Sequence, residues 1–147
     1  ENDIKEIGYK YQMTDLGACL LLESLKEFKK ISSHRKKIFN IYLRKLKNNN
    51  LIKIINDTGK FTHSTWLFTI VTDKKDYLQK KLRLAKIESN QVHFRNDRYS
   101  IFKNFIKNKR FPNMDFIEKK YLVLPVHTKM TIADAHYVAN MVNKILS

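Results

Sequence analysis

The sequence predicts an α/β domain in which a small sheet is covered by helices. Apolar residues recur at helical spacing in the first third of the chain, near residue 80 and at the C-terminus. Short stretches rich in β-branched and aromatic residues, which favour strands, lie between these helical runs. The chain has 147 residues, of which 43% are hydrophobic. That is enough for one domain with its own core.

Helices are expected over the first third of the chain. Thr14 can cap a helix whose first turn contains Asp15. Its broad apolar face predicts burial and consists of Leu16, Cys19, Leu20, Leu22, Leu25 and Phe28. Ser33 offers a second cap before another apolar stripe, formed by Ile38, Ile41, Tyr42 and Leu46. The segment therefore predicts two helices, or one bent helix, that end at the turn signal in 47–50.

Strand candidates occupy the middle of the chain. Residues 51–55 and 64–72 are predicted strands joined by a turn at 56–60. Asp73 can cap a following helix with an apolar inner face, made of Tyr77, Leu78, Leu82 and Ala85. Residues 90–94 predict another short strand, and Phe102, Phe105 and Ile106 favour one or two helical turns after it.

The last third predicts a short helix, a strand and a long helix. The short helix is expected at 114–120, and the strand at 121–126 stops at Pro125. Thr131 and Asp134 have the spacing of a capping box at the start of the terminal helix. Without repeats or low-complexity linkers, the chain predicts a single domain.

A net charge of +15 is the strongest feature of the composition. It would attract polyanions, so a basic module that binds nucleic acid or another polyanion is one hypothesis. Ordinary solvated lysines on the outer faces of helices explain the charge as well. Because no RNP motif, zinc-finger spacing or helix-turn-helix signature is present, specific nucleic-acid binding is not expected. No apolar run approaches the roughly 20 residues of a membrane span, so no membrane partner is expected.

The sequence gives little support for a metal site or a catalytic nucleophile. The five histidines are scattered and lack ligand spacing, so no metal site is predicted. Cys19, the single cysteine, excludes an internal disulfide and favours the cytoplasm. Its place among leucines predicts a buried, unreactive thiol. The three glycines are too far apart for a phosphate-binding loop.

Two polar segments remain as candidate binding sites. In 8–15, Lys10 and Gln12 precede a helix N-terminus, a place suited to an anion, although an ordinary loop would look the same. In 91–100, a strand would bring His93 and Arg95 to one face, as a clamp for a phosphate or a hydroxyl-rich ligand. A polar turn built on residues 96–97 is the alternative.

The order of these pieces resembles a known family. "GYKYQMTDLGACLLLESLKEF", followed by "HRKKIFNIYLRKL", is similar to the G-[YF]-x-Y-x-[ML]-T-[DN]-x-x-A-A segment and next helix of the DegT/DnrJ/EryC1/StrS family. These are pyridoxal-phosphate (PLP) dependent nucleotide-sugar aminotransferases. Later pieces follow in the family's order: "STWLFTIV", "LRLAKIESNQVHFRND" and "LVLPVHTKMTIADAHYVANMVNKIL". The resemblance covers nearly the whole chain and is most specific at its two ends.

The resemblance implies the C-terminal part of a type I aminotransferase fold. Residues 1–48 would be a helical segment that links from a large PLP domain, and 49–147 would be the small α/β domain. The large domain carries the lysine that binds PLP as an imine, so no catalytic residue is expected in this chain. Alone, the chain should be inactive.

The resemblance also assigns roles to four residues. Lys10 stands where the family often has Asn, and would contact the PLP phosphate of the other subunit of a homodimer. Gln12, His93 and Arg95 would contact the nucleotide sugar, while Asn96 and Asp97 shape the turn. The complete enzyme would convert a keto-deoxy nucleotide sugar to an amino sugar for surface polysaccharide, with glutamate as donor. A PLP-dependent sugar dehydratase of the same family is an alternative, as is the basic binding module.

Overall fold

The computed structural model describes residues 3–9, 11–55, 64–107 and 109–147. Its strands are β1 (Lys53–Ile54), β2 (Phe68–Val71) and β3 (Tyr121–Leu124). Its α-helices are α1 (Asp15–Lys26), α2 (Phe28–Leu46), α3 (Lys75–Leu84), α4 (Pro112–Glu118) and α5 (Ile132–Ile145). Two short 3-10 turns, η1 (Asn96–Arg98) and η2 (Ser100–Phe102), precede α4. The predicted α/β class is confirmed.

The three strands form one antiparallel sheet in the order β1-β2-β3. Phe68 pairs with Leu124 and Ile70 with Leu122, which places these four buried side chains on one face. Thr69 and Val71 of β2 alternate with them and face the other way. The sheet therefore has one core face and one face that remains partly open.

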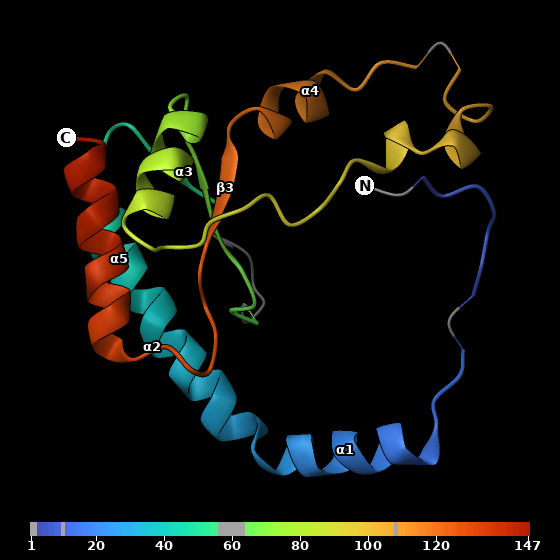
Figure 1. The fold of residues 1–147 in the computed structure, drawn as a ribbon, viewed down its shortest axis with the longest axis horizontal. Helices are drawn as coiled ribbons and strands as arrows, with labels where there is room; N and C mark the ends of the chain where they lie inside the picture. Colours follow the sequence, from blue (N-terminus) through green and yellow to red (C-terminus); the bar gives the residue numbers. More distant parts are fainter. Residues whose placement is uncertain (1–2, 10, 56–63, 108) are drawn as a thin grey trace.

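Helices α2, α3 and α5 cover the core face (Figure 1). The core combines side chains from all three helices with the apolar residues of β2 and β3. Tyr42 of α2 is fully buried against Phe68, and its hydroxyl donates to the Pro125 carbonyl over 2.9 Å. Burial raises the Tyr42 pKa, because the phenolate would lose its hydration.

Local capping signals are realised at two helix starts. The Thr131 hydroxyl accepts from the Asp134 amide over 3.1 Å, and the Asp134 carboxylate accepts from the Thr131 amide over 2.8 Å. These bonds hold the Asp134 pKa below its ordinary value. The Thr14 hydroxyl likewise accepts from the Gly17 amide over 3.1 Å at the start of α1. The predicted capping box and first cap are confirmed.

The predicted burial of the first helix is wrong. Helix α1 contains no buried residue, and its large apolar side chains are half to mostly exposed. Cys19, predicted to be buried, is exposed as well. In Figure 1, α1 extends away from the body formed by α2, α3 and α5. Its residues do have apolar spacing, but the body formed by α2, α3 and α5 does not bury them.

Several predicted elements also begin or end elsewhere; among them, the short helix predicted at 114–120 is α4, two residues earlier, and β1 and β2 are shorter than predicted. Helix α2 begins at Phe28, so Ser33 lies inside it and is not a cap. Helix α3 begins at Lys75 rather than after Asp73, because the Thr72 hydroxyl accepts from the Lys74 amide over 3.2 Å and delays the first turn. Residues 91–94 form no strand, since pairing there is limited to one bridge between Asn90 and Val123. The predicted turn at 56–60 lies outside the described residues.

Candidate functional site

Residues 91–98 leave the edge of the sheet next to β3, where Asn90 bridges Val123, as an extended segment that ends in η1. Two hydrogen bonds fix its course. The Tyr121 hydroxyl donates to the His93 carbonyl over 3.0 Å, and the Gln91 amide donates to the Glu118 carbonyl at the end of α4. Side-chain hydrogen bonds therefore hold the segment in place, whereas a strand would be held by hydrogen bonds between backbone groups.

Arg95 is the main anchor of this segment. Its side chain is 6% exposed and forms ion pairs with three carboxylates. Nη2 lies 2.6 Å from Asp97 Oδ2, while Nη1 lies 2.5 Å from Asp115 Oδ1 and 3.4 Å from Glu118 Oε2. The hydrogen bonds to Asp97 and Asp115 raise the Arg95 pKa further above its ordinary value. The same pairing with Arg95 lowers the Asp97 pKa.

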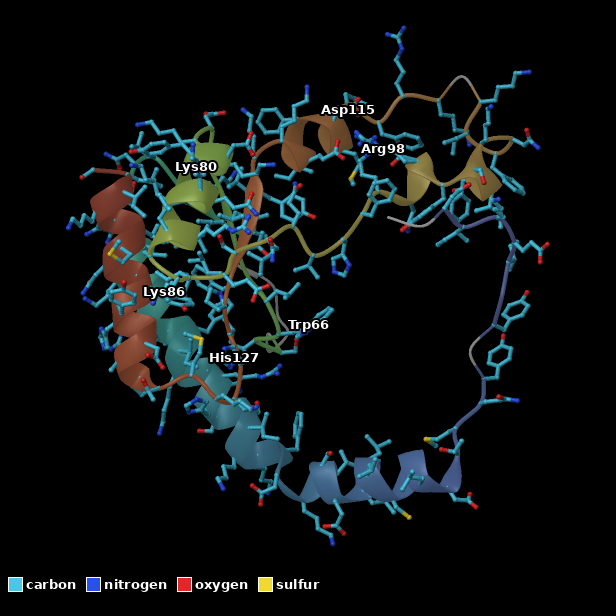
Figure 2. All side chains as sticks on the ribbon, in the orientation of Figure 1. Trp66, Lys80, Lys86, Arg98, Asp115 and His127 are labelled. Atoms are coloured by element: carbon cyan, nitrogen blue, oxygen red, sulfur yellow. The ribbon has the colours of Figure 1, made fainter. Side chains whose placement is uncertain are left out.

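Arg98 extends this cluster of charges. Its Nη2 lies 2.5 Å from Glu118 Oε2, so one carboxylate of α4 meets two guanidinium groups. Figure 2 shows Arg98 close to Asp115 beside α4. The ion pairs join residues 95–98 to a helix that begins more than a dozen residues later in the chain.

His93 has a different environment from Arg95. Its side chain is exposed, and its ring meets Trp66 edge to face at 5.9 Å between ring centroids. His93 and Arg95 do line one hollow of about 740 Å³ on the open face of the sheet, together with Thr69, Met114, Glu118 and Tyr121. We call it the His93 hollow. The structure thus brings the two predicted site residues together, but the Arg95 donors already face carboxylates.

A second hollow, of about 730 Å³, lies beyond Trp66 and is called the Trp66 hollow. Its polar and aromatic lining includes Arg35, Trp66, Lys86, Ser89, His127 and Lys129. Trp66 is 55% exposed and projects away from the sheet, with His127 in the same region (Figure 2). Sequence reasoning missed this residue because it read residues 64–72 only as a strand. The signal that could have pointed to Trp66 is that it is the single tryptophan of the sequence.

The segment before α1 carries the other predicted site residues. Tyr9 and Tyr11 are exposed and stack with ring centroids 5.2 Å apart. Gln12 is exposed and does not line the His93 hollow. Lys10 lies outside the described residues. The segment touches η2, where the Ser100 amide donates to Asp3 over 2.9 Å, and then descends to α1 at the right of the view, opposite α5 (Figure 1).

Two further features concern residues 3–9, 11–55, 64–107 and 109–147, the ranges that the structure describes. Within them, no three His, Cys, Asp or Glu side chains come together as metal ligands. None of the described helices combines the length and the apolar character needed to cross a membrane.

Comparison with known proteins identifies the kind of enzyme that the chain resembles. Residues 1–143 match the DegT/DnrJ/EryC1/StrS aminotransferase family. The chain is 25% identical over 151 residues to UDP-4-amino-4,6-dideoxy-N-acetyl-beta-L-altrosamine transaminase of Campylobacter jejuni, covering 99% of this chain and 40% of that protein. GDP-perosamine synthase of Escherichia coli O157:H7 is 22% identical over 144 residues, covering 96% of this chain and 38% of that protein.

The fold is shared with solved aminotransferases. Helicobacter pylori PseC, an aminotransferase involved in the biosynthesis of pseudoaminic acid, matches with a TM-score of 0.80 and 20% identity. The match covers 99% of this chain and 41% of PseC. The chain therefore spans about 40% of the length of the relatives that it matches.

Proposed function

Because the chain belongs to the DegT/DnrJ/EryC1/StrS aminotransferase family, we propose that it is the C-terminal part of a PLP-dependent nucleotide-sugar aminotransferase. The complete enzyme converts a keto-deoxy nucleotide sugar to an amino sugar. The observation that carries this proposal is the family match over residues 1–143, with about 40% of the relatives' length covered. Both named relatives are enzymes of amino-sugar nucleotides, which supports amino transfer over dehydration.

The remaining part of the enzyme is a large domain that binds PLP through a lysine. When bound, PLP supplies the electron sink that amino transfer requires. This chain supplies substrate contacts and excludes water, and it is inactive by itself. The exposed leucines of α1 support this division, because a helix with an apolar stripe needs a covering surface.

The segment before α1 fits a role in a neighbouring active site. It is extended, and its aromatic and amide side chains are exposed rather than folded onto the body. In a homodimer, Lys10 would hold the PLP phosphate of the other subunit as a point charge, and Gln12 would contact the sugar nucleotide.

His93 and Arg95 divide the work in the His93 hollow. The exposed imidazole of His93 is free to donate to or accept from a sugar hydroxyl or phosphate. Arg95 lines the hollow, and its ion pairs keep residues 95–98 on α4. We assign both to substrate binding, His93 by direct contact and Arg95 chiefly by holding the segment.

Glutamate as the donor, a cytoplasmic location and a role in surface polysaccharide complete the proposal. They follow from the family resemblance and, for location, from the single cysteine.

The test uses the complete protein with PLP, glutamate and a UDP-linked keto-deoxy sugar. Mass spectrometry should find an amino sugar nucleotide together with 2-oxoglutarate, and the 147-residue chain alone should form neither. A product that lacks a hydroxyl and contains no new nitrogen would identify a dehydratase instead. A complete protein that gains no visible absorbance on mixing with PLP would refute the proposal.

A further inference from the structure

Trp66 is presented to solvent by an unusual backbone. The preceding residue, Thr65, has a φ of 55°, in the left-handed region that a β-branched side chain rarely adopts. Thr65 itself is buried at 4% exposure, whereas the Trp66 side chain is 55% exposed. Strained backbone of this kind persists where the surrounding structure holds it, and it clusters at ligand sites. The strain here turns a large flat ring outward.

The hollow that Trp66 borders has more cationic than anionic side chains in its lining. Arg35, Lys86 and Lys129 line it, and in the described part of the chain none of these three forms an ion pair. The lining also includes two carboxylates, Glu88 and Asp134, which bond to neutral amide groups and keep their negative charge. Glu88 accepts from the Asn90 amide over 3.1 Å, and Asp134 serves the capping box.

Two buried donors in the same lining lack acceptors. Among the described residues, Arg35 Nε and Ser89 Oγ are buried without a hydrogen-bond partner. Ser89 is 6% exposed, so bulk water does not satisfy it. Buried polar groups in native proteins nearly always have partners. The hollow therefore combines an aromatic wall and cations with two donors that need an oxygen acceptor.

We infer that the Trp66 hollow binds the nucleoside diphosphate part of the sugar nucleotide. The base stacks on Trp66, and the diphosphate faces Arg35 and Lys129. A planar base matches the indole face, and phosphate oxygens are the acceptors that Arg and Lys recognise. This inference rests on the proposed function and assigns a subsite to its substrate.

The contact between Trp66 and His93 joins the two hollows. The two rings meet at 62°, with Trp66 lining one hollow and His93 the other. A nucleotide seated on Trp66 therefore directs its sugar past the imidazole, into the His93 hollow. One ligand occupies both hollows.

The test is UDP binding to the complete protein, measured by calorimetry and by the Trp66 fluorescence that is lost in Trp66→Phe. Trp66→Ala should weaken UDP binding about 10- to 100-fold, whereas Trp66→Phe should retain most of the affinity. Phe105→Ala, which removes an exposed aromatic ring outside the hollow, is the control and should leave affinity unchanged. Lys129→Gln should weaken UDP more than uridine and reduce the salt dependence of binding.

Unchanged UDP affinity in a folded Trp66→Ala variant would overturn the inference, since the ring would then be covered by protein. So would equal weakening in the Phe105→Ala control. These outcomes leave the proposed function standing if the unmodified protein still transfers an amino group from glutamate. Failure to bind PLP would remove the proposed function, even with UDP bound at Trp66.

Discussion

Arg95 and Asp97 form a two-pronged ion pair, with Nε 2.9 Å from Oδ1 and Nη2 2.6 Å from Oδ2. The two residues are only two positions apart, so the pair closes the turn at η1. The other side of the guanidinium reaches α4 through Asp115. The fork of an arginine makes this geometry possible, because a lysine offers a point charge rather than paired donors.

The role of Arg95 can be separated from direct substrate contact by changing its partner. Asp97→Asn should lower sugar-nucleotide affinity several-fold, because the segment that carries His93 loses the ion pair between Arg95 and Asp97. If Arg95 instead bound the phosphates directly, removing the competing carboxylate would raise affinity. Calorimetry with a UDP-linked sugar on the complete protein distinguishes the two results. Asp76→Asn, on the exposed face of α3, is a charge-matched control and should have little effect.

The stability contribution of Asp97 should depend on pH. Its pKa is below the ordinary value of 3.8 because Arg95 favours the ionised form. A carboxylate with a lowered pKa in the folded state stabilises above its unfolded pKa, and that stabilisation is lost as pH falls through the folded pKa. Wild type should therefore be more stable than Asp97→Asn at neutral pH, and the difference should shrink below pH 3.8. Urea unfolding at several pH values measures it. A difference that grows with acidification would contradict the ion pair.

The stabilisation that the capping box gives to α5 should be measurable by deleting one hydroxyl group. Thr131→Ala removes the acceptor of the Asp134 amide and should cost about 1 kcal/mol of unfolding free energy. Thr128→Ala, at an exposed threonine three residues earlier, is the matched control and should change stability by less than about 0.5 kcal/mol. Equal effects of the two substitutions would mean that the cap does not stabilise α5.

In the 147-residue chain, replacing a leucine of the sheet by alanine should cost more stability than the same replacement in α1. Leu122 is fully buried, so Leu122→Ala should destabilise by about 2–5 kcal/mol through lost packing and a cavity. Leu20 is 62% exposed, so Leu20→Ala should change the unfolding free energy by less than about 0.5 kcal/mol. Thermal unfolding followed by circular dichroism compares them. A large loss from Leu20→Ala would place α1 in a packed core.

The apolar stripe of α1 should make the 147-residue chain self-associate. Leu21→Glu combined with Leu25→Glu should shift sedimentation toward the monomer, because the exposed apolar surface is reduced. Lys29→Glu makes the same change in net charge at an exposed polar position and is the control. If both variants reduce association equally, charge rather than apolar contact drives it.

Local signals in the sequence predicted much of the fold. The helix cap at Thr14, the capping box at Thr131 and the alternation in β2 depend on neighbours within a few residues, so the pattern carries them. The burial of α1 could not be read in this way. Apolar spacing shows that a face needs covering, but not whether the cover lies in the same 147 residues.

The site was less predictable because its contacts span the chain. The partners Asp115 and Glu118 of Arg95 come about twenty residues later, on a helix whose docking only the fold determines. Because Arg95 is buried and paired with those carboxylates, it holds residues 95–98 against α4, whereas the sequence predicted that it would bind a ligand. Trp66 was hidden for another reason, since the unusual φ of Thr65 interrupts a segment that reads as a continuous strand.

The break at Glu27 separates two parts with different resistance to local unfolding. Helix α1 has 12 residues, a length that is marginal for an isolated helix in water, and nothing in the body buries its face. In the 147-residue chain, its amide protons should exchange with solvent long before those of α2, whose last half is locked into the core. The two helices follow each other without a loop, yet we expect them to unfold as separate cooperative units.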